Sequence, residues 1–257
     1  MIEILTTAEL QQARISGALV ADVLRSLRAR CTVGTNLLEL DAWAQEIIEE
    51  AGAESCYVDY EPSFGRGPFG HYICTSVNDA VLHGLPHDYA LADGDLLTLD
   101  LAVSTGGIAA DSAISFVVGE ATEESTALIS TTERALTAGI AAARPGATIG
   151  DLAHAMGSVL SGAGYPINTD FGGHGIGSTM HQDPHVPNTG KQGRGFRLQP
   201  GLMIALEPWI MVDTDRLVTD ADGWTLRSAT GCRTAHSEHT IAITQDGAEI
   251  MTLPSTR

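Results

Sequence analysis

The chain has 257 residues, of which 44% are hydrophobic and 18% are charged, and its formal net charge is −18. A chain of this length can bury a substantial core, and no apolar run in it approaches the length of a membrane span. The excess of 32 acidic over 14 basic residues opposes binding to a nucleic-acid phosphate backbone. We therefore expect a soluble protein without nucleic-acid or membrane partners.

Residues 1–12 lack the basic start, the apolar stretch and the small-residue cleavage site of a secretory signal. The four cysteines are scattered along the chain, without the C-x-x-C spacing of a zinc ribbon or the density of a disulfide framework. Reduced thiols and the absence of a signal sequence both favour the cytoplasm as the location of the protein.

Two N-terminal segments carry apolar residues at helical spacing. The first runs from about residue 8 to residue 28 and follows Thr6-x-x-Glu9, which is the sequence of a capping box. The second follows Thr35, a candidate N-cap, and ends at Gly52. The chain is therefore expected to begin with two antiparallel helices.

Short apolar runs broken by Gly, Pro, Asn and Asp follow over residues 56–119, which indicates strands and turns. The same order then recurs. Helical spacing is found over about 123–143 and 149–161, and strand-like runs continue from there to residue 252. This order predicts two αα-then-β halves.

The two halves also share residues. Three blocks align between them in the same order: 34–40 with 146–152, 91–100 with 198–207, and 111–116 with 238–243. We therefore predict an α+β fold with duplicated halves, approximately 1–120 and 121–257, that are related by pseudo-two-fold symmetry around a curved antiparallel sheet. The halves together form one catalytic domain over residues 1–257. The alternative is that two αα-β segments resemble each other by chance.

Acidic side chains occupy apolar stretches that are expected to form strands. Asp100 and Glu207 each lie in such a stretch, where an unpaired carboxylate is costly to bury. For either residue alone, a salt bridge or a structural hydrogen bond is the ordinary explanation. The aligned blocks add Asp111 and Glu238, and few basic residues lie nearby in the sequence. Divalent cations are then the simplest counter-charge for four carboxylates.

An imidazole ligand is offered by His174, which stands among the glycines of residues 171–177. Glycines allow close approach of the backbone, and His181 and His83 add further imidazoles to the same pattern. The remaining histidines are expected to lie in solvent or in loops, and no role is assigned to them: His71, His87, His154, His185, His236 and His239.

Together these motifs resemble a type I methionine aminopeptidase of peptidase family M24. The resemblance covers roughly residues 7–253 and is carried by Cys74–Asn78 leading to His83-Gly84, Asp100 with Asp111, Gly173–Gly177 with His181, Glu207-Pro208, and Glu238–Thr240. The short interval between His181 and Glu207 leaves no room for the long insertion of type II enzymes. The fold implied is the pita-bread fold, which agrees with the predicted duplication.

By this resemblance, the chain is expected to remove methionine from the N-termini of peptides and nascent proteins, with a preference for a small second residue. Asp111 and Glu238 would bridge two divalent ions (Mn, Fe, Co or Zn), and a hydroxide between these ions would attack the first peptide bond. The implied metal ligands are Asp100, Asp111, His174, Glu207 and Glu238.

The resemblance also implies three catalytic residues. His83 would position the scissile amide, His181 would stabilise the oxyanion, and Glu207 would carry a proton to the leaving amine. Residues 61–70 depart from the family, because they replace a tyrosine-containing stretch that helps to form the side-chain pocket. An apolar, sulfur-tolerant pocket is still expected from Phe69, Cys74, Met180 and Trp224. Ordinary core packing is the alternative for these four, most of all for Met180.

Family members can dock at the ribosome through a basic surface, whereas residues 212–222 are acidic here. We therefore expect no ribosome docking, and we expect a monomer. The enzymatic alternatives are a prolidase-like or aminopeptidase P-like hydrolase, which the short chain disfavours, and a specialised M24 peptidase. A non-catalytic binding paralogue, or a metal-free relative that acts on other C–N bonds, is disfavoured by the intact ligand set.

Overall fold

The computed structural model describes residues 2–63 and 65–255, and no helix among them is long and apolar enough to cross a membrane. The described residues form four helices: α1 (Thr7–Arg30), α2 (Leu37–Glu50), α3 (Glu123–Ala142) and α4 (Ile149–Gly162). These bounds agree with the predicted segments, and the capping box of Thr6 and Glu9 is present at the start of α1. The helical half of the prediction is confirmed.

The N-cap of α2 differs from the prediction. It is Asn36, whose side chain accepts a hydrogen bond from the backbone N–H of Leu38 at 3.0 Å. Thr35 was expected to cap this helix, but its hydroxyl accepts instead from the backbone N–H of Thr32 at 3.0 Å. Thr35 therefore stabilises the turn before the helix, and Asn36 caps the helix.

The strands of the first half are β1 (Glu54–Ser55), β2 (Cys74–Val77), β3 (Ala80–Leu82), β4 (Leu96–Thr105) and β5 (Ile108–Val117). Those of the second half are β6 (Gly172–Gly175), β7 (Gln182–Pro187), β8 (Met203–Leu206), β9 (Trp209–Met211), β10 (Leu217–Thr219), β11 (Leu226–Ser228), β12 (Thr234–His236), β13 (His239–Thr244) and β14 (Gly247–Ile250). The long hairpin β4–β5 pairs with β1 and β2, and a five-stranded sheet has the order β14-β13-β8-β6-β7. The pairings are antiparallel.

Equivalent contacts recur in the two halves. Asn36 at the start of α2 forms an isolated antiparallel bridge with Ala90, and Thr148 at the start of α4 forms the same bridge with Arg197. The backbone N–H groups of the two turn glycines donate at corresponding places, from Gly34 to Leu91 at 2.7 Å and from Gly146 to Leu198 at 2.8 Å. These matched hydrogen bonds support the duplication that the aligned sequence blocks predict.

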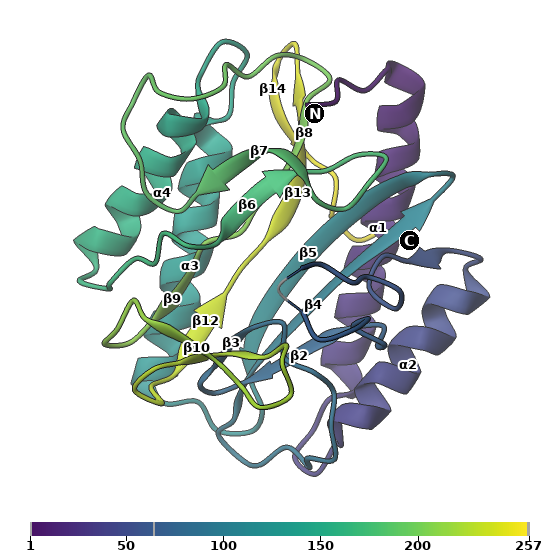
Figure 1. The fold of residues 1–257 in the computed structure, drawn as a ribbon, viewed down its shortest axis with the longest axis vertical. Coiled ribbons are helices and arrows are strands. Elements are labelled where there is room, and N and C mark those ends of the chain that lie inside the picture. Colours follow the sequence, from purple (N-terminus) through teal and green to yellow (C-terminus); the bar gives the residue numbers. More distant parts are fainter. Residues whose placement is uncertain (1, 64, 256–257) are drawn as a thin grey trace.

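Each pair of helices packs against the strands of its own half. In Figure 1, α1 and α2 lie to one side of the strands and α3 and α4 to the other. The core under the first pair includes Leu99 and Leu101 of β4, and the core under the second pair includes Ile204 and Leu206 of β8. Because side chains alternate along a strand, Asp100 points to the face opposite Leu99 and Leu101. Asp100 therefore lies on the face of β4 that is turned away from the helices.

Candidate active site

The two aspartates lie on one face of the β4–β5 hairpin. Asp100 pairs with Ala113 and Asp111 pairs with Ala102, so the two carboxylates are diagonal neighbours on the same side of the ladder. Both are buried, with 8% and 3% of their surfaces exposed. The register of one hairpin thus brings together two residues that the sequence analysis assigned to one metal site.

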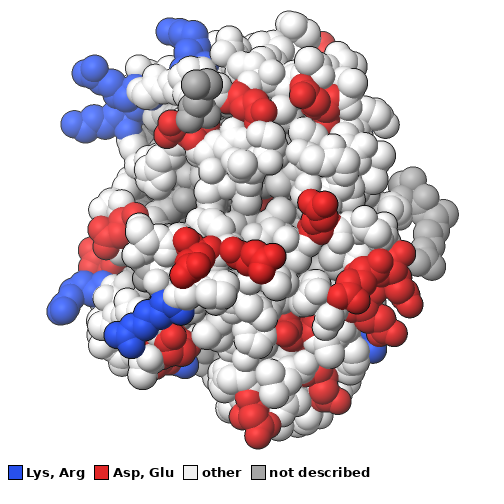
Figure 2. Space-filling view, turned by 45° about the vertical axis from the view of Figure 1, so that its right-hand side comes forward, with Lys and Arg blue, Asp and Glu red and all other residues white. Residues whose placement is uncertain are grey.

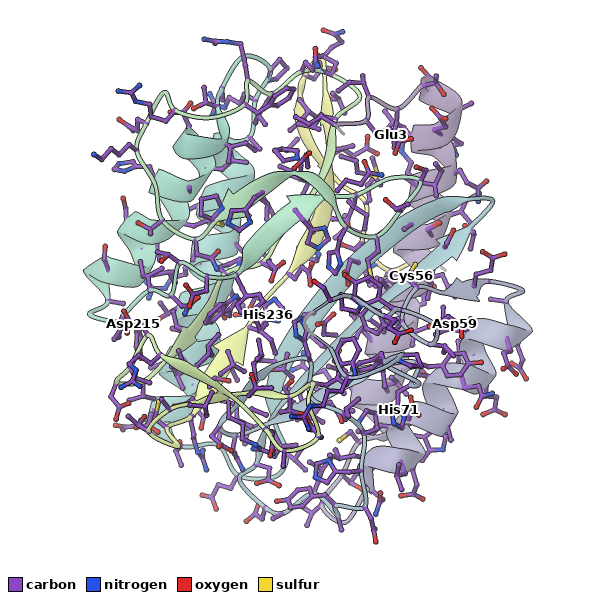
Figure 3. All side chains as sticks on the ribbon, viewed as in Figure 1. Glu3, Cys56, Asp59, His71, Asp215 and His236 are labelled. Carbon is purple, nitrogen blue, oxygen red and sulfur yellow. The ribbon has the colours of Figure 1, made fainter. Side chains whose placement is uncertain are left out.

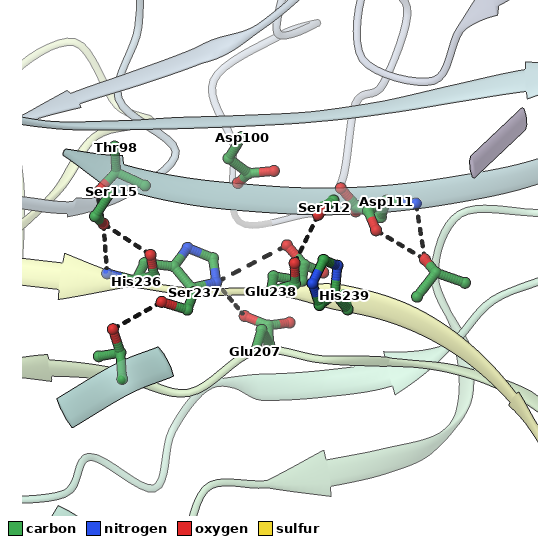
Figure 4. Close-up of polar contacts among 12 residues, drawn as sticks. Thr98, Asp100, Asp111, Ser112, Ser115, Glu207, His236, Ser237, Glu238 and His239 are labelled. Carbon is green, nitrogen blue, oxygen red and sulfur yellow. Dashed lines mark hydrogen bonds and ion pairs between the residues drawn. The ribbon is translucent and has the colours of Figure 1, made fainter. Parts of the chain in front are cut away.

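The second half brings a histidine and two glutamates to the same place. His174 on β6 pairs with Ala205 on β8, and Glu207 follows two residues later, on the same face of the chain. Glu238 directly precedes β13, whose first residue, His239, pairs with Leu206. Figure 4 shows Glu207 and Glu238 facing Asp100 and Asp111 across the site.

Glycines next to His174 allow this arrangement. A Cβ atom on Gly173 would collide with the backbone oxygen of Ala205, and one on Gly175 would collide with the backbone oxygen of Asp183. Only glycine therefore fits between β6 and its two neighbours, β8 and β7. The predicted close backbone approach around the histidine is confirmed.

The polar atoms are spaced as ligands of a cation would be. Nε2 of His174 lies 3.8 Å from Glu207 Oε1 and 4.0 Å from Asp111 Oδ2, which is too long for hydrogen bonds. Ligand atoms of Asp111, His174 and Glu238 lie within 4.8 Å of one another. Nδ1 of His174 is 3.0 Å from the carbonyl oxygen of Gly175. Because a carbonyl only accepts, Nδ1 carries the proton of the neutral ring, and Nε2 presents the lone pair that a metal requires.

The electrostatics of the site also fit a cation. Burial raises the pKa of Asp100 to about 6 and that of Glu207 to about 8, and burial together with the neighbouring carboxylates raises the pKa of Asp111 and Glu238 well above the ordinary range. Burial lowers the pKa of His174 to about 3. Without a cation the carboxylates tend to keep protons, and among the described residues that line the cavity none is Lys or Arg.

The other predicted site residues line the same cavity: His83, His181, Phe69, Cys74, Met180 and Trp224. Phe69 and Trp224 meet edge to face, with ring centroids 5.2 Å apart. Cys74 on β2 pairs with Asp100 on β4, which places the thiol beside the carboxylates. The structure thus brings the expected pocket residues together at one side of the carboxylate cluster.

His83 and His181 approach from different segments. His181 is exposed, and its ring centroid lies 4.3 Å from that of His174. The hydroxyl of Tyr60 lies 2.8 Å from Nδ1 of His181. His83 follows β3 in the left-handed conformation, with φ of 57°, which is uncommon for a residue other than glycine and is characteristic of functional sites.

Trp224 is fixed by its own loop. The carboxylate of Asp222 accepts hydrogen bonds from the backbone N–H groups of Trp224 at 2.8 Å and Thr225 at 2.9 Å. The hydroxyl of Thr225 also donates to Asp222 at 2.6 Å and accepts from the N–H of Leu85 at 3.2 Å. The pocket wall is therefore tied to the segment that carries His83.

Three polar residues that line the cavity were missed by the sequence analysis. His236 was assigned to solvent or a loop, but it is 2% exposed on β12, lines the cavity, and occupies the middle of the molecule in Figure 3. It stands two residues before Glu238, and the alternation of side chains along a strand could have placed it on the same face. Tyr57 and Tyr60 also line the cavity. The departure over residues 61–70 therefore does not deprive the pocket of tyrosine, although Phe64 lies outside the described residues.

Comparison with known proteins agrees with this site. The model of metallopeptidase family M24 matches residues 11–245. Methionine aminopeptidase 1 of Mycobacterium tuberculosis is 39% identical over 255 residues, which cover 96% of this chain and 94% of the relative. Methionine aminopeptidase 1 of Bacillus subtilis is 34% identical over 253 residues, which cover 98% of this chain and 99% of the relative.

Solved structures give the same result for the fold. The crystal structure of methionine aminopeptidase from Thermotoga maritima superposes with a TM-score of 0.93 at 33% identity and covers 98% of this chain and 99% of its own. A prolidase from Pyrococcus furiosus superposes with a TM-score of 0.79 at 20% identity, and the match covers 98% of this chain but 66% of the prolidase. The prolidase likeness shows a shared fold alone.

Proposed function

Because the chain belongs to metallopeptidase family M24, we propose that it removes methionine from the N-termini of peptides and proteins whose second residue is small. The convergence of four carboxylates and one lone-pair imidazole in a cavity walled by aromatic rings carries this proposal. The whole chain would act as one catalytic domain, because both halves contribute to the carboxylate cluster.

The same residues would bind two divalent ions: Asp100, Asp111, His174, Glu207 and Glu238. Carboxylates with one neutral imidazole suit Mn, Fe, Co or Zn. Asp111 and Glu238 would contribute to the binding of both ions, as the family resemblance implies, and the backbone N–H of Glu238 donates to the carbonyl oxygen of Ala113 on β5 at 3.0 Å, which brings these two residues of the two halves together. Ions bound there supply the Lewis acidity that polarises a peptide carbonyl and lowers the pKa of water.

Three side chains of the protein would contribute further to the chemistry. If Tyr60 donates its O–H to Nδ1 of His181, the proton of the neutral ring lies on Nε2, which can then donate to the developing oxyanion. Glu207 would receive a proton during attack and pass it to the leaving amine. His83, at the end of β3, would hold the scissile amide in place.

Cleavage would be restricted to the first residue because the metal site would hold the free α-amine of the substrate while His83 positions the scissile amide, and the first side chain would enter the apolar part of the cavity. Phe69, Met180 and Trp224 are buried around it, with 5%, 6% and 4% of their surfaces exposed. An unbranched apolar side chain suits such a slot, and sulfur packs well against aromatic rings. The rest of the peptide chain would extend out of the cavity past His181, which is exposed.

A prolidase-like hydrolase is the nearest alternative, since it shares the fold. Relatives at 34% to 39% identity that match this chain over almost their whole length favour the methionine enzyme. A non-catalytic paralogue is disfavoured because all five proposed ligands are present at one site.

Metal analysis together with peptide turnover tests the proposal. The purified chain, loaded with Mn²⁺, Co²⁺, Zn²⁺ or Fe²⁺, is given Met-Ala-Ser and X-Pro dipeptides. We expect two ions per chain and cleavage of Met-Ala-Ser only. Preferential cleavage of X-Pro dipeptides would reassign the chain to the prolidase-like group, and bound metal without turnover of either substrate would indicate a binding paralogue.

We also propose a cytoplasmic monomer that acts on free peptide N-termini without docking to RNA. In Figure 2, acidic side chains are spread over the face shown, and the basic ones lie mostly along its left edge. The loop over residues 212–222, which contains β10, carries four aspartates and one arginine. A net charge of −18 opposes association with a polyanion.

A further inference from the structure

His236 is the one imidazole of the cavity that the proposed reaction leaves without a role. It lies at the end of β12, where it pairs with Trp209 of β9. Trp209 follows Glu207 by two residues, so His236 and Glu207 point to the same side of the two strands. Figure 4 shows the ring of His236 directed at the two glutamates.

The Nε2 atom of His236 is buried and has no hydrogen-bond partner among the described residues. It lies 3.9 Å from Glu207 Oε2 and 3.8 Å from Glu238 Oε2. These separations are too long for hydrogen bonds, and a buried nitrogen without a partner is unfavourable. A cation held by the glutamates would give this nitrogen the partner that the protein itself does not supply.

The geometry repeats that of His174. Nε2 of His174 lies 3.8 Å from Oε1 of Glu207, and Nε2 of His236 lies 3.9 Å from Oε2 of the same carboxylate. Two imidazole nitrogens therefore flank one carboxylate, one near each oxygen. The spacing that favours His174 as a metal ligand therefore favours His236 equally.

The backbone of His236 is held by hydrogen bonds that do not involve its ring. Its backbone N–H donates to the hydroxyl of Ser115 at 2.9 Å, and that hydroxyl lies 2.7 Å from the backbone oxygen of His236. Ser115 on β5 also contacts the hydroxyl of Thr98 on β4 at 2.7 Å. The backbone is thus held by the opposite half of the molecule, which leaves Nε2 available to a ligand.

We propose that His236 is a sixth metal ligand, which binds through Nε2 the ion that Glu207 and Glu238 hold, and that it biases this site toward Zn²⁺ or Co²⁺ over Mn²⁺. The inference rests on the proposed metal binding. Imidazole is a better ligand for zinc and cobalt than for manganese, for which oxygen ligands are preferred. A second imidazole should therefore change both the affinity and the selectivity of the site.

The test is calorimetric titration of the full chain with Zn²⁺ and with Mn²⁺, in wild type, His236→Ala and His154→Ala. His154 is an exposed histidine on α4, and its variant controls for adventitious imidazole binding. In His236→Ala we expect Zn²⁺ to bind at least ~10-fold more weakly and Mn²⁺ to lose less. The visible spectrum of bound Co²⁺ should change in the same variant, and His154→Ala should match wild type throughout.

Isotherms of His236→Ala within twofold of wild type would overturn the inference. So would an equal loss for both ions with an unchanged Co²⁺ spectrum, because that result indicates general loosening of the site. If His236→Ala does not fold, nitrogen NMR of the wild-type histidine rings decides. Zn²⁺ should shift two buried imidazole resonances, and a shift of only one would overturn the assignment. A wild-type chain that binds no divalent ion would end both the proposed function and this inference, whereas an active wild type with an unaltered His236→Ala isotherm ends only the latter.

Discussion

The hydroxyl of Tyr57 donates a hydrogen bond of 2.6 Å to Oδ1 of Asp100 and lies 3.5 Å from Oδ1 of Asp111. Burial and the adjacent carboxylates raise the pKa of Tyr57, so the phenol keeps its proton and remains a donor. A carboxylate that receives such a bond is held in one orientation. Tyr57 therefore positions Asp100, and its hydroxyl lies close to Asp111.

Replacing Tyr57 by Phe should weaken metal binding and kcat/KM together by about 10- to 100-fold, because partners that orient ligands typically contribute this much. Titration calorimetry with Mn²⁺ and steady-state kinetics on Met-Ala-Ser measure the two effects. Tyr72→Phe is the matched control, since the hydroxyl of Tyr72 donates to Glu49 at 2.8 Å on the surface. Equal affinities in Tyr57→Phe and Tyr72→Phe would show that the phenol only fills space.

Removal of metal should abolish turnover reversibly and leave the secondary structure intact. The proposed ligands sit on strands or directly beside their ends, and these strands pack on large cores under the helices. Folding therefore does not depend on the ion as it does in a small metal-dependent module. Activity before and after treatment with a chelator, with recovery on adding metal, tests the first part. Circular dichroism tests the second, and a collapse of helical signal on chelation would contradict the prediction.

The metal-free protein should become less stable as the pH rises from about 6.5 to 8. In this window the unfolded carboxyls have already lost their protons, and the unfolded histidines, with a pKa of about 6.5, lose most of theirs in its lower part. In the folded state burial raises the pKa of Glu207 to about 8, and burial together with the neighbouring carboxylates raises the pKa of Asp111 and Glu238 well above the ordinary range. The folded state then binds more protons than the unfolded state, so stability falls with pH, by up to about 1.4 kcal/mol per pH unit for each such carboxyl.

Denaturant unfolding of the chelated protein at several pH values measures this slope. Below about pH 6.5 the buried histidines oppose the trend, because burial lowers the pKa of His174 and His236 to about 3 and the unfolded state takes up protons first. Saturating metal should remove the fall above pH 6.5, since the cation replaces the protons. If the stability of the chelated protein is constant or increases from pH 6.5 to 8, the buried carboxyls do not keep their protons in the folded state.

The helices and the paired aspartates could be predicted because their signals are local. The capping box of Thr6 and Glu9 marks the start of α1, and the apolar spacing that follows it marks the helix itself. Asp100 stands out because an acid interrupts an apolar strand, and Asp111 lies on the same face through the pairing of one hairpin. Each of these predictions depends on a single helix or on two strands that are adjacent in the sequence.

The missed residues depend on contacts that a local pattern does not contain. The described residues between β1 and β2 form no strand or helix, so no periodicity shows that Tyr57 and Tyr60 turn inward. His236 lies on a strand of three residues, too short for an alternating pattern to be recognised by itself. Its burial follows from pairing with β9 and from Ser115 in the other half of the chain.

Loss of a bridging carboxylate should cost more activity than loss of His83. Asp111→Asn and Glu238→Gln each alter both proposed ion sites, and a metal site supplies several kcal/mol of transition-state stabilisation, or about 10³-fold in rate. His83→Ala removes a group that lies outside the ligand set and should cost about 10- to 100-fold. The comparison is kcat/KM under saturating metal, and a fully active Asp111→Asn enzyme would eliminate the two-metal proposal.

The final prediction concerns the first-residue pocket, whose wall is Trp224. Its ring meets Phe69 edge to face at 5.2 Å, and it stands 6.4 Å from the ring of Tyr60. A slot between these rings should accept an unbranched side chain better than a β-branched one. Met-Ala-Ser and Leu-Ala-Ser should therefore be cleaved faster than Val-Ala-Ser. Met-Leu-Ser should be poor, because a bulky second residue displaces the carbonyl from the attacking water.

Trp224→Ala should weaken this selectivity and leave metal affinity unchanged. The difference of a methyl or methylene group in a well-formed pocket is worth roughly 10- to 200-fold in kcat/KM, so the preference for Met over Val should shrink toward unity when the wall is removed. Trp43→Ala is the matched control, because Trp43 packs under Arg30 on the helical side, with the guanidinium 4.0 Å from its ring centroid. Rates for the four peptides in wild type and both variants decide the matter. A wild-type preference for valine, equal cleavage of Met-Ala-Ser and Met-Leu-Ser, or an unchanged preference in Trp224→Ala would show that this pocket does not select methionine and that the chain acts on a more specialised substrate.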